Sequence, residues 1–337
     1  MNKFSKSCRI LFILAVLGAC HSPGNDNASN STPRLIQKTS IALPAVKGGF
    51  DLMALDRGKR RLFVSAEDNR TLEVLDLEKQ RPVHSIPGLE EPKWVVYRPE
   101  KKALYVATGG DGKVTEFDDS NFSILHRFTF KEKCNNLRFD ETTGQLWVGV
   151  GDSFGALGII DTRQDTIVGQ IPLSDYPKQF ELDGNRIYVN IPRKNMIEVA
   201  NRVTRKVIAT WPVKEAPENV PMALDRTHQR LFVGCEPGKF VVFSTATGTS
   251  VASLDIDKDA DGIYYDEHRR RLYISCGEGF LDVISQNDPD HYQLLEKIPT
   301  AQGAGTSLYS AELDEIFLAV PQANGRQAAI RIYQPAD

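Results

Sequence analysis

One short pattern recurs along this chain, and its spacing constrains the fold more than any other feature. Each copy is a tetrad in which aliphatic residues flank an aromatic one, as in Arg61-Leu62-Phe63-Val64. Its second residue recurs every 41 to 44 residues, at positions 62, 104, 146, 187, 231, 272 and 316. A repeat of roughly 40–50 residues is typical of propellers and solenoids. Apolar side chains on both faces of a strand indicate a sheet that is covered on both sides, as in blades stacked around an axis.

The repeat also predicts how the ring closes. Several blades end in an apolar residue followed by proline, as in Ile86-Pro87, and Leu43-Pro44 shows this pattern although no blade precedes it. The last repeat, over 307–334, offers only three strands. Proline suits an outer strand, because an edge tolerates the missing N–H. We therefore predict an all-β chain: a seven-bladed β-propeller of four-stranded antiparallel blades, closed by an N-terminal strand over 36–43 that completes the last blade.

The first residues have the pattern of a bacterial lipoprotein signal. Basic residues precede a short apolar core over 10–17, and the sequence LGAC over 17–20 resembles the lipobox, in which the cysteine is lipidated. A plain signal peptide cleaved after Ala19 is the alternative. We expect a lipoprotein signal peptide over 1–19, a lipidated flexible tether over 20–34 with Cys20 as the lipid site, and the propeller over 35–337. The expected location is the cell envelope, as a lipid-anchored membrane protein, and the outer membrane if the cell is Gram-negative.

One passage resembles a known repeat family. Leu146-Trp147-Val148-Gly149 supplies an aromatic second strand, the sequence GIIDT over 158–162 a third strand, and Ile171-Pro172 the end of a fourth. Together they resemble the YVTN-type propeller repeat, over roughly residues 35–334. The resemblance implies a seven-bladed propeller that is often secreted or surface-attached in bacteria. The family has no single activity, so function has to be argued from the site.

The charge of the chain bears on its partners. The formal net charge is −3 over 337 residues, which argues against a nucleic-acid partner, whose phosphates require a basic face. Two basic runs, over 58–61 and 268–271, fall on hairpins of the face opposite the expected binding site. They are either solvated hairpins or a basic surface that touches anionic lipid headgroups or a protein partner.

Propeller ligands usually bind at the mouth of the central channel, where the loops that enter each inner strand converge. Counting four residues back from the apolar end of each inner strand gives one position per blade: Asp51, Lys93, Asn135, Lys178, Val220, Asp261 and Gly305. The loops after the second strands add Glu67, Arg193, Glu236 and Glu278. One side of this mouth is expected to be acidic and the other to carry Lys93, Lys178 and Arg193. These residues are either solvated loop charges or a polar ligand site with separated charges.

The residue types limit the chemistry of the mouth. No histidine is expected there, so a histidine zinc site or a Ser-His-Asp triad would lack its imidazole. A carboxylate site for a divalent cation such as Ca²⁺ stays open, because Ca²⁺ takes oxygen ligands alone. Gluconolactonase-like propellers use such a set. The candidate ligands here are Asp51, Glu236, Asp261 and Glu278.

Three cysteines follow the expected lipid site. Cys235 and Cys276 occupy equivalent positions in adjacent blades. Such positions usually lie farther apart than the disulfide limit of about 7 Å between Cα atoms, so buried free thiols are favoured over a disulfide. Cys134 would then be an unpaired thiol near the mouth.

These observations lead to one functional expectation and one alternative. We expect a binding scaffold in the cell envelope that takes a small-molecule or protein ligand at the propeller mouth. The alternative is a metal-dependent lactonase or related hydrolase at the same place. The two differ in whether three or four carboxylate or amide oxygens converge on the channel axis.

Overall fold

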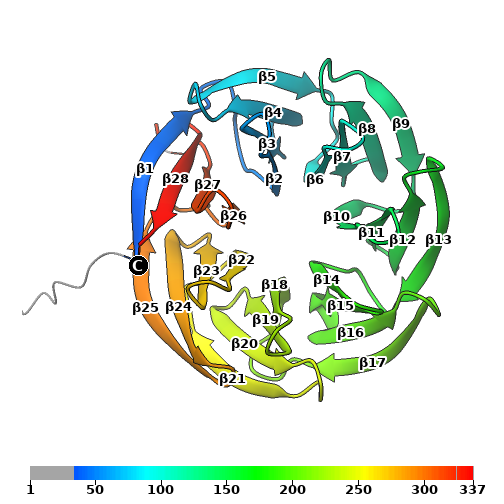
Figure 1. Ribbon diagram of the computed structural model, residues 1–337, viewed down its shortest axis with the longest axis vertical. Coiled ribbons are helices and arrows are strands. Elements are labelled where there is room, and N and C mark those ends of the chain that lie inside the picture. Colours follow the sequence, from blue (N-terminus) through cyan, green and yellow to red (C-terminus); the bar gives the residue numbers. More distant parts are fainter. Residues whose placement is uncertain (1–33, 324, 337) are drawn as a thin grey trace, which may run out of the picture. The chain divides into compact units, whose positions relative to one another are not determined.

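The structure is a computed structural model that describes residues 34–323 and 325–336. Within these residues the strands form seven four-stranded antiparallel sheets, arranged as blades around a central channel (Figure 1). The predicted seven-bladed propeller is therefore confirmed. In six blades, four successive strands pair in sequence order. The predicted signal peptide, the lipid site Cys20 and nearly all of the tether lie outside the described residues.

Each blade contributes one strand to each of four concentric rings. The innermost strands are β2 (Met53–Asp56), β6 (Pro92–Arg98), β10 (Cys134–Asp140), β14 (Phe180–Asp183), β18 (Asn219–Asp225), β22 (Ala260–Asp266) and β26 (Ser307–Ser310). The second strands are β3 (Arg61–Ala66), β7 (Ala103–Thr108), β11 (Gln145–Gly151), β15 (Arg186–Ile191), β19 (Arg230–Cys235), β23 (Arg271–Cys276) and β27 (Glu315–Val320).

The outer half of each blade follows in the same order. The third strands are β4 (Thr71–Asp76), β8 (Lys113–Asp118), β12 (Gly155–Asp161), β16 (Met196–Asn201), β20 (Lys239–Ser244), β24 (Phe280–Asp288) and β28 (Ala329–Pro335). The outermost strands are β5 (Arg81–Pro87), β9 (Ile124–Thr129), β13 (Thr166–Leu173), β17 (Lys206–Pro212), β21 (Ser250–Asp255), β25 (His291–Pro299) and β1 (Leu35–Ala42). A short 3-10 helix, Pro192–Lys194, joins β15 to β16. No helix among the described residues is long and apolar enough to cross a membrane.

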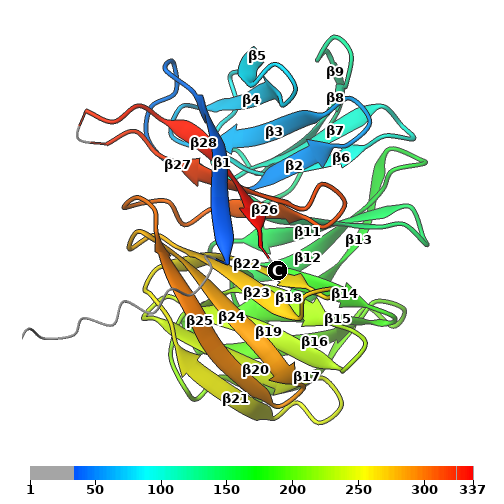
Figure 2. The same ribbon diagram turned by 60° about the vertical axis from the view of Figure 1, so that its left-hand side comes forward.

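The ring closes through its N-terminal strand, as predicted. Strand β1 pairs antiparallel with β28, from Leu35 opposite Pro335 to Ala42 opposite Ala329, and is the outer strand of the last blade (Figure 2). Leu35 and Ile41 of β1 are buried. The first and last parts of the propeller therefore share one sheet and one apolar core.

The second strands carry the repeated tetrad and supply the core between blades. Leu62, Phe63 and Val64 are fully buried, because one face of β3 packs on the preceding blade and the other on the next. Outermost strands such as β21 have mostly exposed or half-buried side chains. Apolar burial is worth about 25 cal/mol per Å², so the sheets are held mainly by their inner and middle strands.

The hairpins between inner and second strands are built from local turn chemistry. Asp56 accepts a hydrogen bond from the backbone N–H of Lys59 at 3.1 Å, and Arg60 then takes a left-handed conformation (φ 49°). Gly144 occupies the same place in the third blade, with φ 71°. The aspartate stabilises the start of the turn and the left-handed residue reverses the chain. The fourth blade differs, because its turn is shorter and pairs Asp183 directly with Arg186.

Candidate functional site

The predicted mouth residues lie where the inner strands begin. In β6 and β22 the pairing register shifts by one residue, at Lys93 and at Asp261 respectively. In β10 the shift covers Asn135 and Asn136. Such bulges re-aim a side chain without interrupting the strand. They therefore leave these polar residues out of the blade core at the start of each strand.

An acid and lysine cluster occupies one part of the mouth. The Lys93 ammonium hydrogen-bonds to the Glu67 carboxylate and lies 3.9 Å from Asp51 Oδ2. The Asp51 side chain is only 16% exposed. Its pKa is held well above its usual range by burial and by the charge of Asp261, and the charge of Lys93 only partly offsets this. The negative charge of the carboxylates in this cluster is thus only partly neutralised by Lys93.

The cluster continues around Asp261. Burial and the nearby charge of Asp259 raise the pKa of Asp261, while Lys178 and a 3.3 Å contact from the Thr306 hydroxyl lower it. Burial and neighbouring carboxylates also raise the pKa of Glu236, and Lys178 again lowers it. The ammonium of Lys178 therefore interacts with carboxylates from different blades. The structure brings together these predicted mouth residues: Asp51, Glu67, Lys93, Lys178, Glu236 and Asp261.

The other predicted residues have different partners. Asn135 hydrogen-bonds to the hydroxyl of Tyr176, and the Arg193 guanidinium lies 5.5 Å from the centre of the Tyr176 ring. Glu278 accepts a hydrogen bond from the backbone N–H of Lys258 at 3.0 Å. The expected separation of charge across the mouth is also wrong, because Lys93 and Lys178 lie among the acids. The long lysine side chains reach the carboxylates of neighbouring blades.

The ring of polar side chains is interrupted twice, by Val220 in the fifth blade and by a glycine in the seventh. The aligned position there is Gly305, which has no side chain, while the blades on either side present Asp261 and Asp51. The Thr306 hydroxyl lies 3.4 Å from the carbonyl oxygen of Phe50 and 3.3 Å from Asp261 Oδ2, so it spans the same interval. Two carboxylates with raised pKa values therefore flank Gly305, and the Thr306 hydroxyl occupies part of the interval between them.

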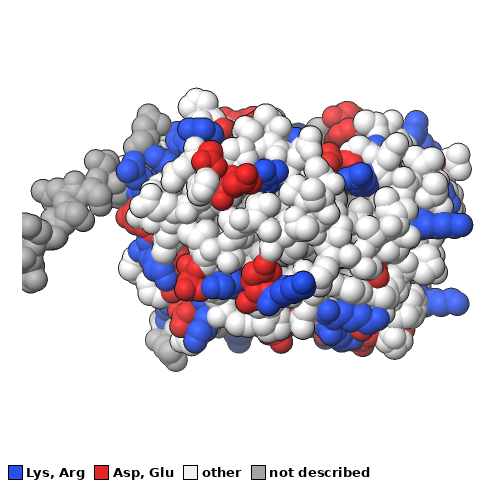
Figure 3. Space-filling view, turned by 90° about the horizontal axis from the view of Figure 1, so that it is seen from below, with Lys and Arg blue, Asp and Glu red and all other residues white. Residues whose placement is uncertain are grey.

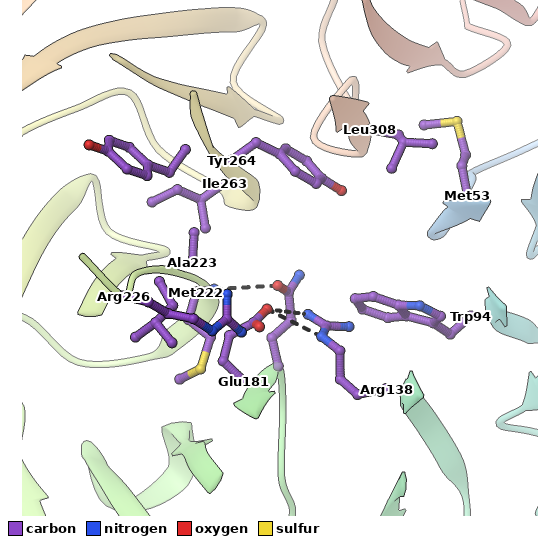
Figure 4. A pocket seen from close by; sticks show the side chains of 13 residues that line it. Met53, Trp94, Arg138, Glu181, Met222, Ala223, Arg226, Ile263, Tyr264 and Leu308 are labelled. Atoms are coloured by element: carbon purple, nitrogen blue, oxygen red, sulfur yellow. Dashed lines mark hydrogen bonds and ion pairs between the residues drawn. The ribbon is translucent and has the colours of Figure 1, made fainter. Parts of the chain in front are cut away.

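A cavity of about 340 Å³ lies in the channel next to this mouth. Gln179 connects the two, since it lines the cavity and its amide donates a 2.9 Å hydrogen bond to the carbonyl oxygen of Asp261. Inner strands of every blade line the cavity, through Met53, Trp94, Arg138, Glu181, Met222, Ile263 and Leu308 (Figure 4). Its volume falls in the range of small-ligand sites.

One ion pair faces the apolar side chains of the cavity. Arg138 donates to Glu181 Oε1 at 3.0 and 3.2 Å, and its guanidinium lies 4.3 Å from the centre of the Trp94 ring. Ile263 and Leu308 lie across the channel from this pair (Figure 4). The cavity is thus charged on one side and apolar on the other, which suits a ligand with both kinds of surface.

The sequence interpretation missed this ion pair, although a signal for it exists. Counting one residue back from the apolar end of each inner strand, instead of four, gives charged residues only in the third and fourth blades, at Arg138 and Glu181. Adjacent blades place these positions side by side. The same alignment that found the mouth would therefore have found the pair.

The cysteines are structural. Cys134, Cys235 and Cys276 are buried and free, so the expectation of free thiols is confirmed and no disulfide joins the adjacent blades. Burial raises the pKa of each thiol, that of Cys235 to about 12. Since the thiolate is the nucleophile, these residues are inert at neutral pH.

The basic hairpins of the opposite face have acidic partners. Lys59 and Arg61 both lie 3.0 Å from Asp119, and Arg269 lies 2.8 Å from Asp314. On the side of the propeller seen in Figure 3, basic and acidic side chains are interspersed near the rims, with a mostly uncharged wall between them. The two basic runs are therefore largely neutralised within the protein.

Comparisons with known proteins support the fold. No protein-family model and no curated protein sequence matches the chain. A chain of the Kuenenia stuttgartiensis hydrazine synthase matches with a TM-score of 0.73 at 16% identity, over 85% of this chain and 97% of that one. A chain from a mitotic checkpoint complex matches with a TM-score of 0.71 at 14% identity, over 98% of this chain and 99% of that one. At such identities the likeness establishes a shared propeller fold, and the activity has to be argued from the channel and its mouth.

Proposed function

We propose that this chain is an exported, lipid-anchored propeller that binds a positively charged ligand at its channel mouth, as a recognition scaffold of the cell envelope. The carrying observation is that Gly305, which has no side chain, lies between the blades that present Asp51 and Asp261, near a cavity with an apolar wall. The charged group of the ligand takes the gap and its apolar part takes the cavity. Cys20, behind an apolar leader, supports the anchor.

The charge balance of the mouth favours a cation. The pKa shifts of Asp51, Glu236 and Asp261 all report excess negative charge or burial that the nearby lysines do not offset. The carboxylates that interact in this region are Asp51, Glu67, Glu218, Glu236, Asp259 and Asp261, against the ammonium groups of Lys93 and Lys178. In a partly buried site, a bound ammonium or guanidinium interacts with such carboxylates more strongly than in water.

Lys93 supports the chemistry of this proposal. Its ammonium is already held by the carboxylates of Glu67 and Asp51 on the other side of the first blade. A ligand ammonium at the gap would have an equivalent environment between Asp51 and Asp261. Propellers commonly bind proteins, and one structural neighbour comes from a checkpoint complex. A lysine or arginine side chain of a protein partner has the same chemistry as a small amine.

No observation favours the hydrolase alternative. Among the described residues, one group of three histidine or carboxylate side chains has all its ligand atoms within 4.8 Å, and it lies on the outer wall. It includes none of the proposed Ca²⁺ ligands, which were Asp51, Glu236, Asp261 and Glu278. Ca²⁺ binding at the mouth therefore stays a prediction without a converging ligand set.

A matched pair of probes tests the proposal. The molecules 2-phenylethylamine and 3-phenylpropionate share an apolar body and carry opposite charges, and calorimetry on the full chain measures both. We expect the amine to bind and the carboxylate not to. Because binding favours the ionised carboxylates, amine affinity should rise with pH through the raised pKa values of Asp51 and Asp261.

Variants locate the binding. A charge-assisted hydrogen bond contributes about 1.5–3 kcal/mol, so Asp261→Asn and Asp51→Asn should each raise the Kd of the amine about tenfold or more. Asp255→Asn is the control, because Asp255 is an exposed residue of the outermost strand β21. Equal binding of both probes would contradict the proposal. So would an amine Kd that neither Asp261→Asn nor Asp51→Asn changes.

The anchor is tested separately. Cys20→Ser should release the protein from the membrane fraction or block its processing. Unchanged processing and membrane retention would show that the lipobox interpretation is wrong.

A further inference from the structure

Three donor atoms face one another on the outer wall, away from the channel. Glu116 is on β8 and His126 on β9 of the second blade, and Asp165 is in the turn between β12 and β13 of the third. His126 Nδ1 lies 3.6 Å from Glu116 Oε2 and 3.9 Å from Asp165 Oδ2. One ligand atom from each residue lies within 4.8 Å of the other two. No two of the donor atoms are close enough for a good hydrogen bond.

The remaining carboxylate oxygens of this group are already held. The Tyr105 hydroxyl donates to Glu116 Oε1 at 2.7 Å. The Lys101 ammonium lies 3.0 Å from Asp165 Oδ1 and 3.7 Å from Glu116 Oε1. Tyrosine and lysine thus fix both carboxylates through one oxygen each. The second oxygens are left directed at the imidazole, which is how partners outside a metal's own ligands orient those ligands.

Two of the three side chains are held in place by their surroundings. Glu116 is 3% exposed, and its hydrogen bond from Tyr105 is on Oε1, so Oε2 is the oxygen of this buried side chain that faces His126 Nδ1, at 3.6 Å. The His126 ring stacks on the buried ring of Phe128, with centroids 6.1 Å apart and planes inclined by 23°. The imidazole is itself 48% exposed, so solvent reaches the open side of the group.

We propose that Glu116, His126 and Asp165 form a Zn²⁺ site that joins the second and third blades. Zinc binds imidazole nitrogen and carboxylate oxygen at about 2.0–2.2 Å, which in a tetrahedron sets the donors about 3.3 Å apart. The two separations from His126 Nδ1, 3.6 and 3.9 Å, need to close by about 0.3 and 0.6 Å, and the two carboxylates, which lie within 4.8 Å of each other, approach as the ion binds. Water takes the fourth position on the exposed side.

The ligand types select the metal. One nitrogen and two carboxylate oxygens suit Zn²⁺ and other divalent transition metals. Ca²⁺ prefers six to eight oxygen ligands, so it should not bind here. The two carboxylates and Lys101 leave one net negative charge, which a divalent cation offsets. This site is independent of the proposed ligand at the channel mouth.

Zinc titration of the full chain tests the proposal. After removal of metals with EDTA, we expect calorimetry to show one bound Zn²⁺ per chain. We also expect the melting temperature to rise with Zn²⁺ concentration, because the ion binds the folded state. Ca²⁺ at the same concentrations should not weaken the binding of Zn²⁺ to this site. A wild-type protein that binds no Zn²⁺ would overturn the proposal.

Substitutions then locate the ion. His126→Asn should abolish the titration, and Tyr105→Phe, which removes only a hydroxyl that positions Glu116, should weaken Zn²⁺ binding about 10–100-fold. His291→Asn is the matched control, because His291 is also exposed and contacts a single carboxylate, that of Asp288 at 2.8 Å. It should leave the affinity unchanged. Zn²⁺ binding that survives His126→Asn, or that is lost equally in His291→Asn, would place the ion elsewhere and overturn the site.

Discussion

At the scale of single residues, the pair of acids Asp257 and Asp282 has the most demanding hydrogen-bonding requirement. The pair lies beneath the loop that leads to the mouth. Asp282 is fully buried and accepts the backbone N–H of Asp257 at 2.8 Å through Oδ2. Asp282 Oδ1 and Asp257 Oδ2 receive no hydrogen bond from any donor of the described residues. Lys297 contacts the other oxygen of Asp257 at 3.0 Å. A proton on Asp282 supplies a donor that this pair otherwise lacks.

This pair gives stability a pH dependence of known sign. Burial and the side chain of Asp257 raise the pKa of Asp282 to about 7, although the hydrogen bond from the backbone N–H of Asp257 partly offsets them. An unfolded aspartate titrates near 3.9, so between these values the folded state binds more protons. The free energy of unfolding should therefore fall as pH rises from about 4 to 7, by at most about 1.4 kcal/mol per pH unit for this group. Urea denaturation of the wild type and Asp282→Asn across this range measures it.

The control for this experiment has the opposite sign. The exposed Asp255 has its pKa lowered by a hydrogen bond from Lys239. Asp255→Asn should not gain stability relative to the wild type as pH rises, whereas Asp282→Asn should. If the difference between wild type and Asp282→Asn is the same at pH 4 and pH 7, the protonation of Asp282 does not contribute to stability in this range.

Individual residues also mark the limit of inference from the sequence. Lys93 and Asp261 could be placed at the mouth because a regular repeat aligns equivalent positions in every blade. Their partners could not, because a lysine side chain reaches across to whichever neighbouring blade offers a carboxylate. His126 could be assigned to an outer strand, but its approach to Asp165 depends on how the turn of the next blade packs. Contacts between blades require three-dimensional geometry that a repeat period does not contain.

At the scale of elements, closure by β1 is the feature that the sequence predicted most fully. An apolar-proline ending without a preceding blade, and a last repeat one strand short, were sufficient. The structure adds a register shift between Gln37 and Thr39, which no sequence signal indicated. Strand β1 covers one edge of β28 and buries Leu35 and Ile41, so it contributes to the core as well as to the ring.

Truncation tests the energetic role of β1. Deleting residues 21–45 removes the buried Leu35, Ile41 and Leu43 and exposes the edge of β28. At about 1.5–3 kcal/mol for each buried aliphatic side chain, we expect the free energy of unfolding to fall by about 4 kcal/mol or more. Deleting residues 21–33 is the control and should leave it nearly unchanged. Equal melting temperatures for both truncations would mean that β1 does not close the ring.

At the scale of the whole molecule, the seven blades make a channel whose two halves differ in character. The mouth holds carboxylates that are not fully compensated, and the cavity beside it joins an apolar wall to the Arg138–Glu181 pair. Neither half exists in a single repeat, because the residues that line the cavity come from all seven blades. The break in the ring of polar residues at Gly305 is likewise a property of the assembled molecule.

We propose that a cationic group binds at Gly305, between Asp51 and Asp261, and one substitution tests this directly. Gly305→Lys supplies a tethered ammonium at the gap, and a Cβ there would meet its nearest neighbours at 3.4 Å, an ordinary contact. Gly305→Met is the control, with a stem of similar length and no charge.

The measurement is the melting of both variants with and without 2-phenylethylamine. We predict that Gly305→Lys is more stable than Gly305→Met by about 1.5 kcal/mol or more at pH 7, loses this advantage at pH 3 where the carboxyls are protonated, and no longer binds the amine. A lysine variant that is no more stable than the methionine variant at pH 7, and that still binds the amine, would contradict the account.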